Sequence, residues 1–303
     1  MARQVDLWRC AIVKQPIETL CQADIVPANL IWLPMPGCWR FHADPFGVWR
    51  DDMLYVFVET MSHARLKGHI DVFIFDRQLR LRGTTTVLKT AWHLSYPSVF
   101  EADGEVWMLP EARRSGQLTL YRARDFPETW EAVCEIPLDA PAVDATQLRY
   151  DGRWWLFYAH VVRGAAPRSE LRIAFADRLT GPWRPHPLNP VVVGADRSRP
   201  GGTAILRGGT IELPVQDCTD SYGGALRKLS ISRLDDTAFE ATDHAWLRSP
   251  AALSPFCHGL HTASAAGPVS LIDLKSIDTS WPARGVRSLG KWRRRRDGPV
   301  TCA

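Results

Sequence analysis

Acidic side chains recur at corresponding places in several segments of this chain that look alike. Asp44 and Asp144 each precede the first apolar run of a segment, and Glu59 and Glu111 each end the second apolar run of a segment. Crowded carboxylates raise one another's pKa, so one can hold its proton near neutral pH while another stays ionised. Such a pair performs general acid and base catalysis, which cleavage of a glycosidic bond requires. The four residues can act in this way only if the fold brings them together.

The segments that carry these residues are copies of one structural plan. Each has a polar residue, a small residue or proline, an apolar strand, a tight turn and a second apolar strand. Counted from Asp44, corresponding residues follow at intervals of 52, 48, 55 and 62 residues, the size of a four-stranded propeller blade. The five copies are ADPFGVWRDDMLYVFVE from Ala43, SYPSVFEADGEVWMLPEA from Ser95, VDATQLRYDGRWWLFYA from Val143, SRPGGTAILRGGTIELPVQD from Ser198 and, more weakly, GLHTASAAGPVSLIDLK from Gly259.

Turn signals within the repeats indicate antiparallel strand pairs. Asp51-Asp52, Asp103-Gly104, Asp151-Gly152 and Gly208-Gly209 separate runs that are rich in Val, Tyr, Trp and Phe. Strand-like runs between the repeats, such as HIDVFIFD and LRIAFAD, would supply the outer strands. We predict an all-β fold, a five-bladed β-propeller over residues 43–285. Residues 1–42 are expected to pack on the propeller or close its ring, and residues 286–303 to form a flexible basic tail.

The repeat also predicts which polar residues meet. The first strand of every blade lines the central channel, so corresponding residues form a ring at one mouth, and the second strands add a ring beside it. Taken singly, each residue could be a solvated strand end or a turn former, but the coincidence in four blades favours a site. The predicted funnel holds Asp44, Tyr96, Asp144, Arg199 and His261 in the first ring and Glu59, Glu111 and Gln216 in the second, with Asp217, Tyr222 and His258 nearby.

Signals for metals and cofactors are weak. His258 and His261 stand three residues apart in HGLH, and we expect a hydrogen-bonded pair at the mouth rather than metal ligands. The seven cysteines include no CxxC pair, so neither a zinc site nor a disulfide framework is indicated. We predict no metal and no cofactor.

Composition narrows the class of protein. The chain has 303 residues, a formal net charge of +4 and no recognisable RNA or DNA motif, so a nucleic-acid partner is not expected. No apolar stretch approaches the about 20 residues of a membrane-spanning helix. Lys14 and Glu18 interrupt the region where a secretory signal would be apolar, and we therefore expect a cytoplasmic location. The run GKWRRRRDG could hold the chain weakly near anionic lipid.

Several long motifs resemble one known family in the same order. These are ADPFGVW, HLSYPSVFEADGEVWMLPEA, YRARDFPETW, VDATQLRYDGRWWLFY, GPWRPHPLNPVV, SRPGGTAI, QDCTDSYGGAL and HGLHT. They resemble the propeller domain at the N-terminal side of plant glucosamine inositolphosphorylceramide transferases, found also in bacterial proteins fused to a formyltransferase-like domain. That domain is similar to the five-bladed glycoside hydrolases of families 43, 32, 62 and 130. The resemblance implies a five-bladed propeller and sugar chemistry.

The likeness to the family 43 hydrolases also implies residue roles. Asp44 occupies the place of their general base in blade one. Blade two would carry an Asp that modulates a pKa, and this chain has Tyr96 there. Blade three would carry a Glu acid, and this chain has the shorter Asp144, so Glu111 is a second candidate for the acid.

Three hypotheses of function follow. The first is an intracellular carbohydrate-active enzyme that cleaves or transfers a glycosyl unit in glycolipid or polysaccharide biosynthesis, with Asp44 as base or nucleophile and Asp144 or Glu111 as acid. The remaining funnel residues would bind hydroxyls or an anionic group of a sugar or glycoconjugate. The second is a non-catalytic sugar-binding module that serves a glycosyltransferase or formyltransferase partner. The third, motivated by Arg199, is phosphorolysis or phosphosugar transfer.

Overall fold

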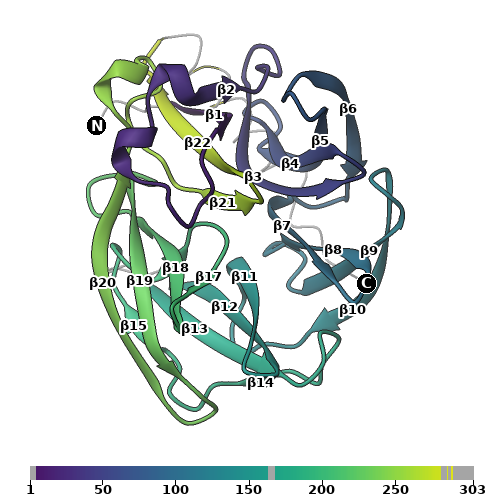
Figure 1. The fold of residues 1–303 in the computed structure, drawn as a ribbon, viewed down its shortest axis with the longest axis vertical. Helices are drawn as coiled ribbons and strands as arrows, with labels where there is room; N and C mark the ends of the chain where they lie inside the picture. The colour runs from purple at the N-terminus through teal and green to yellow at the C-terminus, as the bar shows by residue number, and fades with distance from the viewer. Residues whose placement is uncertain (1–4, 163–167, 281–284, 286–287, 289–303) are drawn as a thin grey trace.

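The fold is a ring of five β-sheets, as Figure 1 shows along the shortest axis of the molecule. The computed structural model describes residues 5–162, 168–280, 285 and 288. Each sheet is one blade, which confirms the predicted all-β class and five-bladed propeller. The predicted basic tail, 286–303, lies outside the described residues except for Ser288. Among the described residues, no helix has the length and apolar character to cross a membrane.

The blades follow one another along the chain, with the innermost strand first. Blade 1 has β3 (Arg40–Arg50), β4 (Met53–Ser62), β5 (Lys67–Phe75) and β6 (Leu81–Leu88). Blade 2 has β7 (Ser95–Ala102), β8 (Glu105–Glu111), β9 (Leu118–Asp125) and β10 (Thr129–Ile136). Blade 3 has β11 (Val143–Tyr150), β12 (Arg153–Val162), β13 (Arg168–Ala176), β14 (Arg184–Pro185) and β15 (Val192–Val193). Blade 4 has β16 (Arg199–Pro200), β17 (Ile205–Arg207), β18 (Thr210–Asp217), β19 (Ala225–Leu234) and β20 (Phe239–Arg248).

Blade 5 is built from both ends of the chain. It has β21 (Ala263–Ala266), β22 (Val269–Asp278), β1 (Val5–Val13) and β2 (Leu30–Trp32). β1 pairs antiparallel with β22 along its whole length, from Val5 opposite Asp278 to Val13 opposite Ser270. Residues before Ala43 therefore supply two strands of a blade. Within the described chain, three short 3-10 helices lie outside the blades: Gln22–Asp24, Pro27–Asn29 and Ala251–Leu253.

Apolar side chains fill the interfaces between neighbouring blades. Phe46 and Phe57 of blade 1 pack with Met108 of blade 2, for example, and Trp155 of blade 3 packs with Leu213 of blade 4. Each blade is thus buried on both faces, which is why its inner strands are nearly continuous runs of large apolar residues. This packing fixes the positions of the inner strands, which line the central channel.

The hairpin turns set the register that the repeat predicts. In all four predicted turns both central residues have positive φ, as Asp151 (49°) and Gly152 (73°) illustrate. Two such residues define a type I′ turn, whose twist matches that of the strands. These turns set which residues lie opposite each other in the two strands, so the second ring lies directly beside the first. The opposed pairs are Ala43–Glu59, Ser95–Glu111, Val143–Ala159 and Arg199–Gln216.

The same β-bulge occurs in the first strands of blades 1, 2 and 3. The register shifts between Ala43 and Phe46, between Ser95 and Ser98, and between Val143 and Thr146. The residues at the bulges, Asp44, Tyr96 and Asp144, have φ of 51°, 44° and 50°. Non-glycine residues adopt this region at a cost of about 1–3 kcal/mol, and bulges often re-aim a side chain next to a functional site. Asp44 therefore lies within β3, not at the start of a strand as the repeat suggested.

We expect Gly202→Ala to destabilise the propeller by about 3 kcal/mol or more. Gly202 has φ of 138° and bridges Ala263, so that it joins blade 4 to blade 5. A Cβ at this position would lie 1.7 Å from the Ala263 carbonyl oxygen. Urea denaturation measures the effect. The control is Gly83→Ala in β6, where nothing lies within 4 Å of the added carbon, and equal unfolding midpoints for the two variants would contradict the expectation.

Candidate functional site at the propeller mouth

Buried carboxylates connect the blades around the mouth. Asp273 of β22 accepts hydrogen bonds from the backbone amides of Asp44 (3.0 Å), His261 (3.0 Å) and Thr262 (3.0 Å). Asp44 in turn accepts one from the amide of Tyr96 at 3.1 Å. The amide of Asp144 donates to Glu111 Oε2 at 3.3 Å. The three bulge amides, which the strand ladder leaves unpaired, are thus each satisfied by an acidic side chain.

Asp44 is the most connected acid of the predicted set. Its side chain also accepts a hydrogen bond from Thr262 Oγ1 (2.9 Å), and His261 Nε2 lies 3.4 Å from its Oδ1. Only 5% of Asp44 is exposed. Burial raises the pKa of Asp44 to about 6, against the opposing charge of His261. A carboxylate offers about four acceptor directions, so three donors leave Asp44 room for one more.

Asp144 is held by a cation and an amide. Its Oδ2 accepts hydrogen bonds from Arg199 Nε and from Gln216 Nε2, the latter at 2.7 Å. The Arg199 guanidinium reaches the Tyr222 hydroxyl at 3.3 Å and lies over the Tyr222 ring, 4.9 Å from its centre. Because the side chain of Arg199 is still 21% exposed, the pair faces the solvent of the mouth.

Two glutamates of the second ring favour their protonated form. Burial raises the pKa of Glu59 well above its usual value, and the nearby charges of Asp44 and Glu111 add to the shift. Burial and the charge of Asp144 likewise raise the pKa of Glu111, although Arg199 opposes the change. Both glutamates therefore hold a proton to a higher pH than an exposed glutamate does.

His261 is enclosed by aromatic and acidic groups. The Trp8 ring of β1 stacks on it with centroids 3.9 Å apart and an interplanar angle of 18°. Its Nδ1 lies 2.7 Å from Asp273 Oδ2, in an ion-pair contact that is poorly aligned for a hydrogen bond. Burial alone would lower the pKa of His261, but the charges of Asp273 and Asp44 outweigh it and raise the pKa. The three residues offer ligand atoms within 4.8 Å of one another, a set that could hold a metal ion.

Tyr96 crosses the centre of the ring. It is fully buried, its ring packs edge-on against Phe46, and its hydroxyl contacts Thr146 Oγ1 at 2.8 Å. The amide of Gly202 also donates to the Tyr96 hydroxyl at 2.6 Å. A residue of blade 2 is thereby tied to blades 3 and 4. Burial raises the pKa of Tyr96 well above its usual value, so its hydroxyl is neutral.

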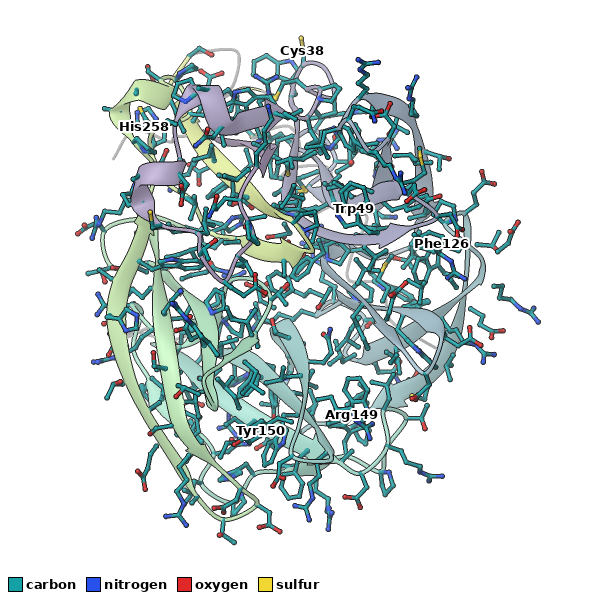
Figure 2. The ribbon with its side chains drawn as sticks, viewed as in Figure 1. Cys38, Trp49, Phe126, Arg149, Tyr150 and His258 are labelled. Carbon is teal, nitrogen blue, oxygen red and sulfur yellow. The ribbon has the colours of Figure 1, made fainter. Side chains whose placement is uncertain are left out.

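Asp217 and His258 lie apart from the carboxylates. Both line a separate cleft of about 180 Å³ in blade 4, together with Asp220 and Arg248. Figure 2 shows His258 on the outer side of the ring. His258 Nδ1 contacts the Pro255 carbonyl at 3.2 Å, whereas His261 contacts Asp44 and Asp273. The expected hydrogen-bonded pair of histidines is therefore wrong, because each ring has other partners: His258 contacts the chain beside it, and His261 contacts two acids.

Four residues of the site were missed in the sequence: Trp8, Thr262, Asp273 and Lys275. Lys275 is buried and donates from Nζ to Ser221 Oγ (3.1 Å) and to the Tyr222 carbonyl, which fixes the loop that carries Tyr222. Tyr222 itself is 41% exposed above Arg199. Asp273 and Lys275 had a readable signal, since they are charged residues inside the apolar run VSLIDLK.

We expect Glu59→Gln to weaken the dependence of stability on pH. Because the folded state raises the pKa of Glu59, the unfolded chain ionises first as pH rises, and this contribution to stability falls with increasing pH. For each pH unit over which only the unfolded state is ionised, the free energy of unfolding falls by about 1.4 kcal/mol. Melting temperatures at pH 5 and pH 8 measure this: the loss on going to pH 8 should be smaller in the variant.

The matched control is Glu101→Gln in blade 2, which removes an exposed carboxylate. It should melt like the parent protein at both pH values. A Glu59→Gln variant with the same pH dependence as the parent would show that Glu59 does not hold its proton in the folded state.

Comparison with known proteins gives a family match and two kinds of relatives. Residues 34–249 match the family described as "Glucosamine inositolphosphorylceramide transferase 1, N-terminal". The glucosamine inositolphosphorylceramide transferase 1 of Arabidopsis thaliana is 35% identical over 208 residues, 67% of this chain and 27% of that protein. The Oryza sativa subsp. japonica protein of the same name is 36% identical over 200 residues, 64% of this chain and 27% of that protein. The chain thus spans about a quarter of the length of these relatives.

Solved structures with a similar fold include glycoside hydrolases. A family 117 glycoside hydrolase of Zobellia galactanivorans superposes with a TM-score of 0.54 at 12% identity and covers 91% of this chain and 92% of its own. The α-L-arabinofuranosidase of Podospora anserina gives a TM-score of 0.57 at 13% identity and covers 81% of this chain and 93% of its own. At such identities the likeness establishes the fold alone. The family and fold indicated by the motifs are confirmed.

Proposed function

The chain belongs to the family of the N-terminal domain of glucosamine inositolphosphorylceramide transferase 1, and from this premise we propose that it cleaves or transfers a glycosyl unit of a glycoconjugate. The proposal places the reaction at the mouth of the propeller. The names of the relatives support a carbohydrate-active role, and the acids at the mouth support the chemistry.

The observation that carries the proposal is a pair of buried acids at one mouth, Asp44 and Glu111, each with a raised pKa. Burial raises the pKa of Glu111 well above its usual value, which favours the protonated form that a general acid needs. Asp44 has a pKa of about 6, so it is mostly ionised at pH 7. A proton donor and a proton acceptor at one opening are what glycosidic cleavage needs.

Each group has one role in the reaction. Glu111 donates its proton to the oxygen that leaves the anomeric carbon, and the bond between that carbon and oxygen breaks. Asp44 takes the proton of the attacking water, or of an acceptor hydroxyl, as the new carbon–oxygen bond forms. Asp144 is kept in place by Arg199 and Gln216, where it stabilises the positive charge that develops on the sugar.

A specific observation favours the sugar-binding module as the second candidate. Both oxygens of Asp44 already accept hydrogen bonds, and Tyr96 stands where the resemblance leads us to expect an Asp. A mouth of this kind could bind a sugar for a glycosyltransferase or formyltransferase partner without catalysis. The two candidates differ in turnover.

Asp44→Asn and Glu111→Gln separate the two candidates. If the site is catalytic, each variant should lower turnover of nucleotide sugars, aryl glycosides or glycolipid donors by at least about 100-fold while sugar binding persists. Matched controls are Asp51→Asn in the first turn of blade 1 and Glu101→Gln in blade 2, which change the same side-chain types at exposed sites. Sugar binding by a wild-type protein that turns over none of these donors, with or without inorganic phosphate, would leave the module as the function.

The pH profile gives an independent check of the two roles. Because Asp44 must be ionised, kcat/KM should rise through about pH 6. It should fall at a higher pH, where Glu111 loses the proton that burial makes it retain. A profile that is flat between pH 5 and pH 8 would contradict the assignment of base and acid to these residues.

A further inference from the structure

A second cleft opens on the mouth face of blade 2. Its volume is about 500 Å³, within the range of small-molecule sites. Two connections form its walls: the turn between β8 and β9, residues 112–117, and the crossing from β10 to β11, residues 137–142. Successive strands run in opposite directions, so both connections lie at the edge where β8 ends and β11 begins. The cleft therefore shares the face of the propeller on which Glu111 and Asp144 lie.

The cleft starts beside the proposed acid. Arg113 of one wall follows Glu111 by two residues, and Ala142 of the other precedes Asp144 by two. Two residues of chain span at most about 7 Å. Because the Asp144 amide donates to Glu111, the inner ends of both walls meet at the acid.

Both walls are fixed by side-chain contacts. Ser115 bonds the carbonyls of Ala112 and Gln117 at 2.8 and 2.9 Å and so closes the first turn. Asp139 of the crossing accepts hydrogen bonds from Tyr158, from Arg172 Nη1 (2.8 Å) and from Asn189 Nδ2 (3.2 Å). Such anchoring holds the walls in place before any ligand arrives.

The lining is suited to a ring that carries hydroxyl groups. Buried Leu118 and Ile136 offer an apolar floor, and Gln117, Glu135 and Arg113 offer hydrogen-bonding groups around it. Gln117 Nε2 donates to Glu135 Oε2 at 2.6 Å, and Arg113 Nη2 donates to the Val161 carbonyl at 3.2 Å. Acidic and basic groups are mixed, so the lining favours a neutral polyol over a strongly charged ligand.

We propose that this blade 2 cleft holds the sugar ring on the leaving-group side of the scissile bond. The inference rests on the proposed function. A general acid protonates the leaving oxygen, so the leaving group must lie on the side of Glu111, where the blade 2 cleft begins. The blade 4 cleft, of about 180 Å³, lies beside Asp217 and away from the acid.

Filling the cleft tests the proposal. The probes are methyl glycosides of common hexoses and the disaccharides with the same non-reducing-end sugar. In the wild type the matching disaccharide should bind at least tenfold more tightly than its methyl glycoside. Ala140→Trp, in the crossing, should remove this tenfold advantage and leave the methyl glycoside within twofold of the wild type. Ala132→Trp on the exposed outer strand β10 is the control and should change neither affinity.

A smaller substitution and a photolabelling experiment test the same assignment independently. Should Ala140→Trp fail to fold by its melting curve, Ala140→Leu fills less space and should reduce the advantage in part. A disaccharide with a diazirine on its reducing-end ring should label peptides from residues 113–118 or 137–142. Labelling of residues 217–225, or an unchanged disaccharide affinity in both filled variants, overturns the cleft assignment alone. A wild type that binds none of the probes overturns the cleft assignment together with the proposed function.

Discussion

Acidic side chains that cap the backbone amides of the bulges are the interaction on which this molecule depends. Each bulge turns Asp44, Tyr96 or Asp144 to positive φ and removes its amide from the strand ladder. An unsatisfied buried amide costs about 1–3 kcal/mol, and an acidic side chain that accepts its hydrogen bond removes this cost. Because the acid comes from a neighbouring blade for Asp44, Tyr96 and Asp144 alike, the same hydrogen bonds also join blade 5 to blade 1, blade 1 to blade 2 and blade 2 to blade 3. The acidic side chains therefore help to hold the ring of blades together.

The same contacts set the proton affinities at the mouth. Asp44 and Glu111, which accept hydrogen bonds from amides, are buried near Glu59, and burial together with mutual repulsion raises the pKa of all three acids. Raised pKa values mean that ionisation costs folding stability, so a fold selected for stability alone would not collect these groups. Arg199, His261 and Lys275 bring positive charge to the same region and limit the cost. A structural solution to unpaired amides therefore produces acids that suit general acid and base chemistry.

The inner strands could be predicted from the sequence because turn residues and apolar runs are visible within short stretches of chain. Four Asp- and Gly-rich turns define the register, and the register alone brings Glu59 and Glu111 beside the first ring. It could not find Trp8, which reaches the site because β1 pairs with β22 from the far end of the sequence, where Trp8 lies opposite Lys275. It also misplaced Asp217 and His258, since a repeat gives the edge of the sheet but not how far a loop carries its side chains outward. The bulge at Asp44 could not be seen in the sequence because β3 is buried on both faces, so an inserted residue does not interrupt its apolar run.

An acid that stabilises the fold can also take part in a reaction only if its oxygens can accept one more hydrogen bond. The donors on Asp44 would each lower its pKa, yet the value is about 6, because removal of the carboxylate from water outweighs them. A carboxylate with this affinity is a better base near neutral pH than an exposed one, and one acceptor direction is left for a water or hydroxyl proton. Tyr96 cannot tune the site by ionising, since its hydroxyl is neutral and bonded to Thr146 and Gly202. Burial is the largest cause of the raised pKa of Glu111, and two charges then tune it: the charge of Asp144 raises it further and that of Arg199 limits the rise.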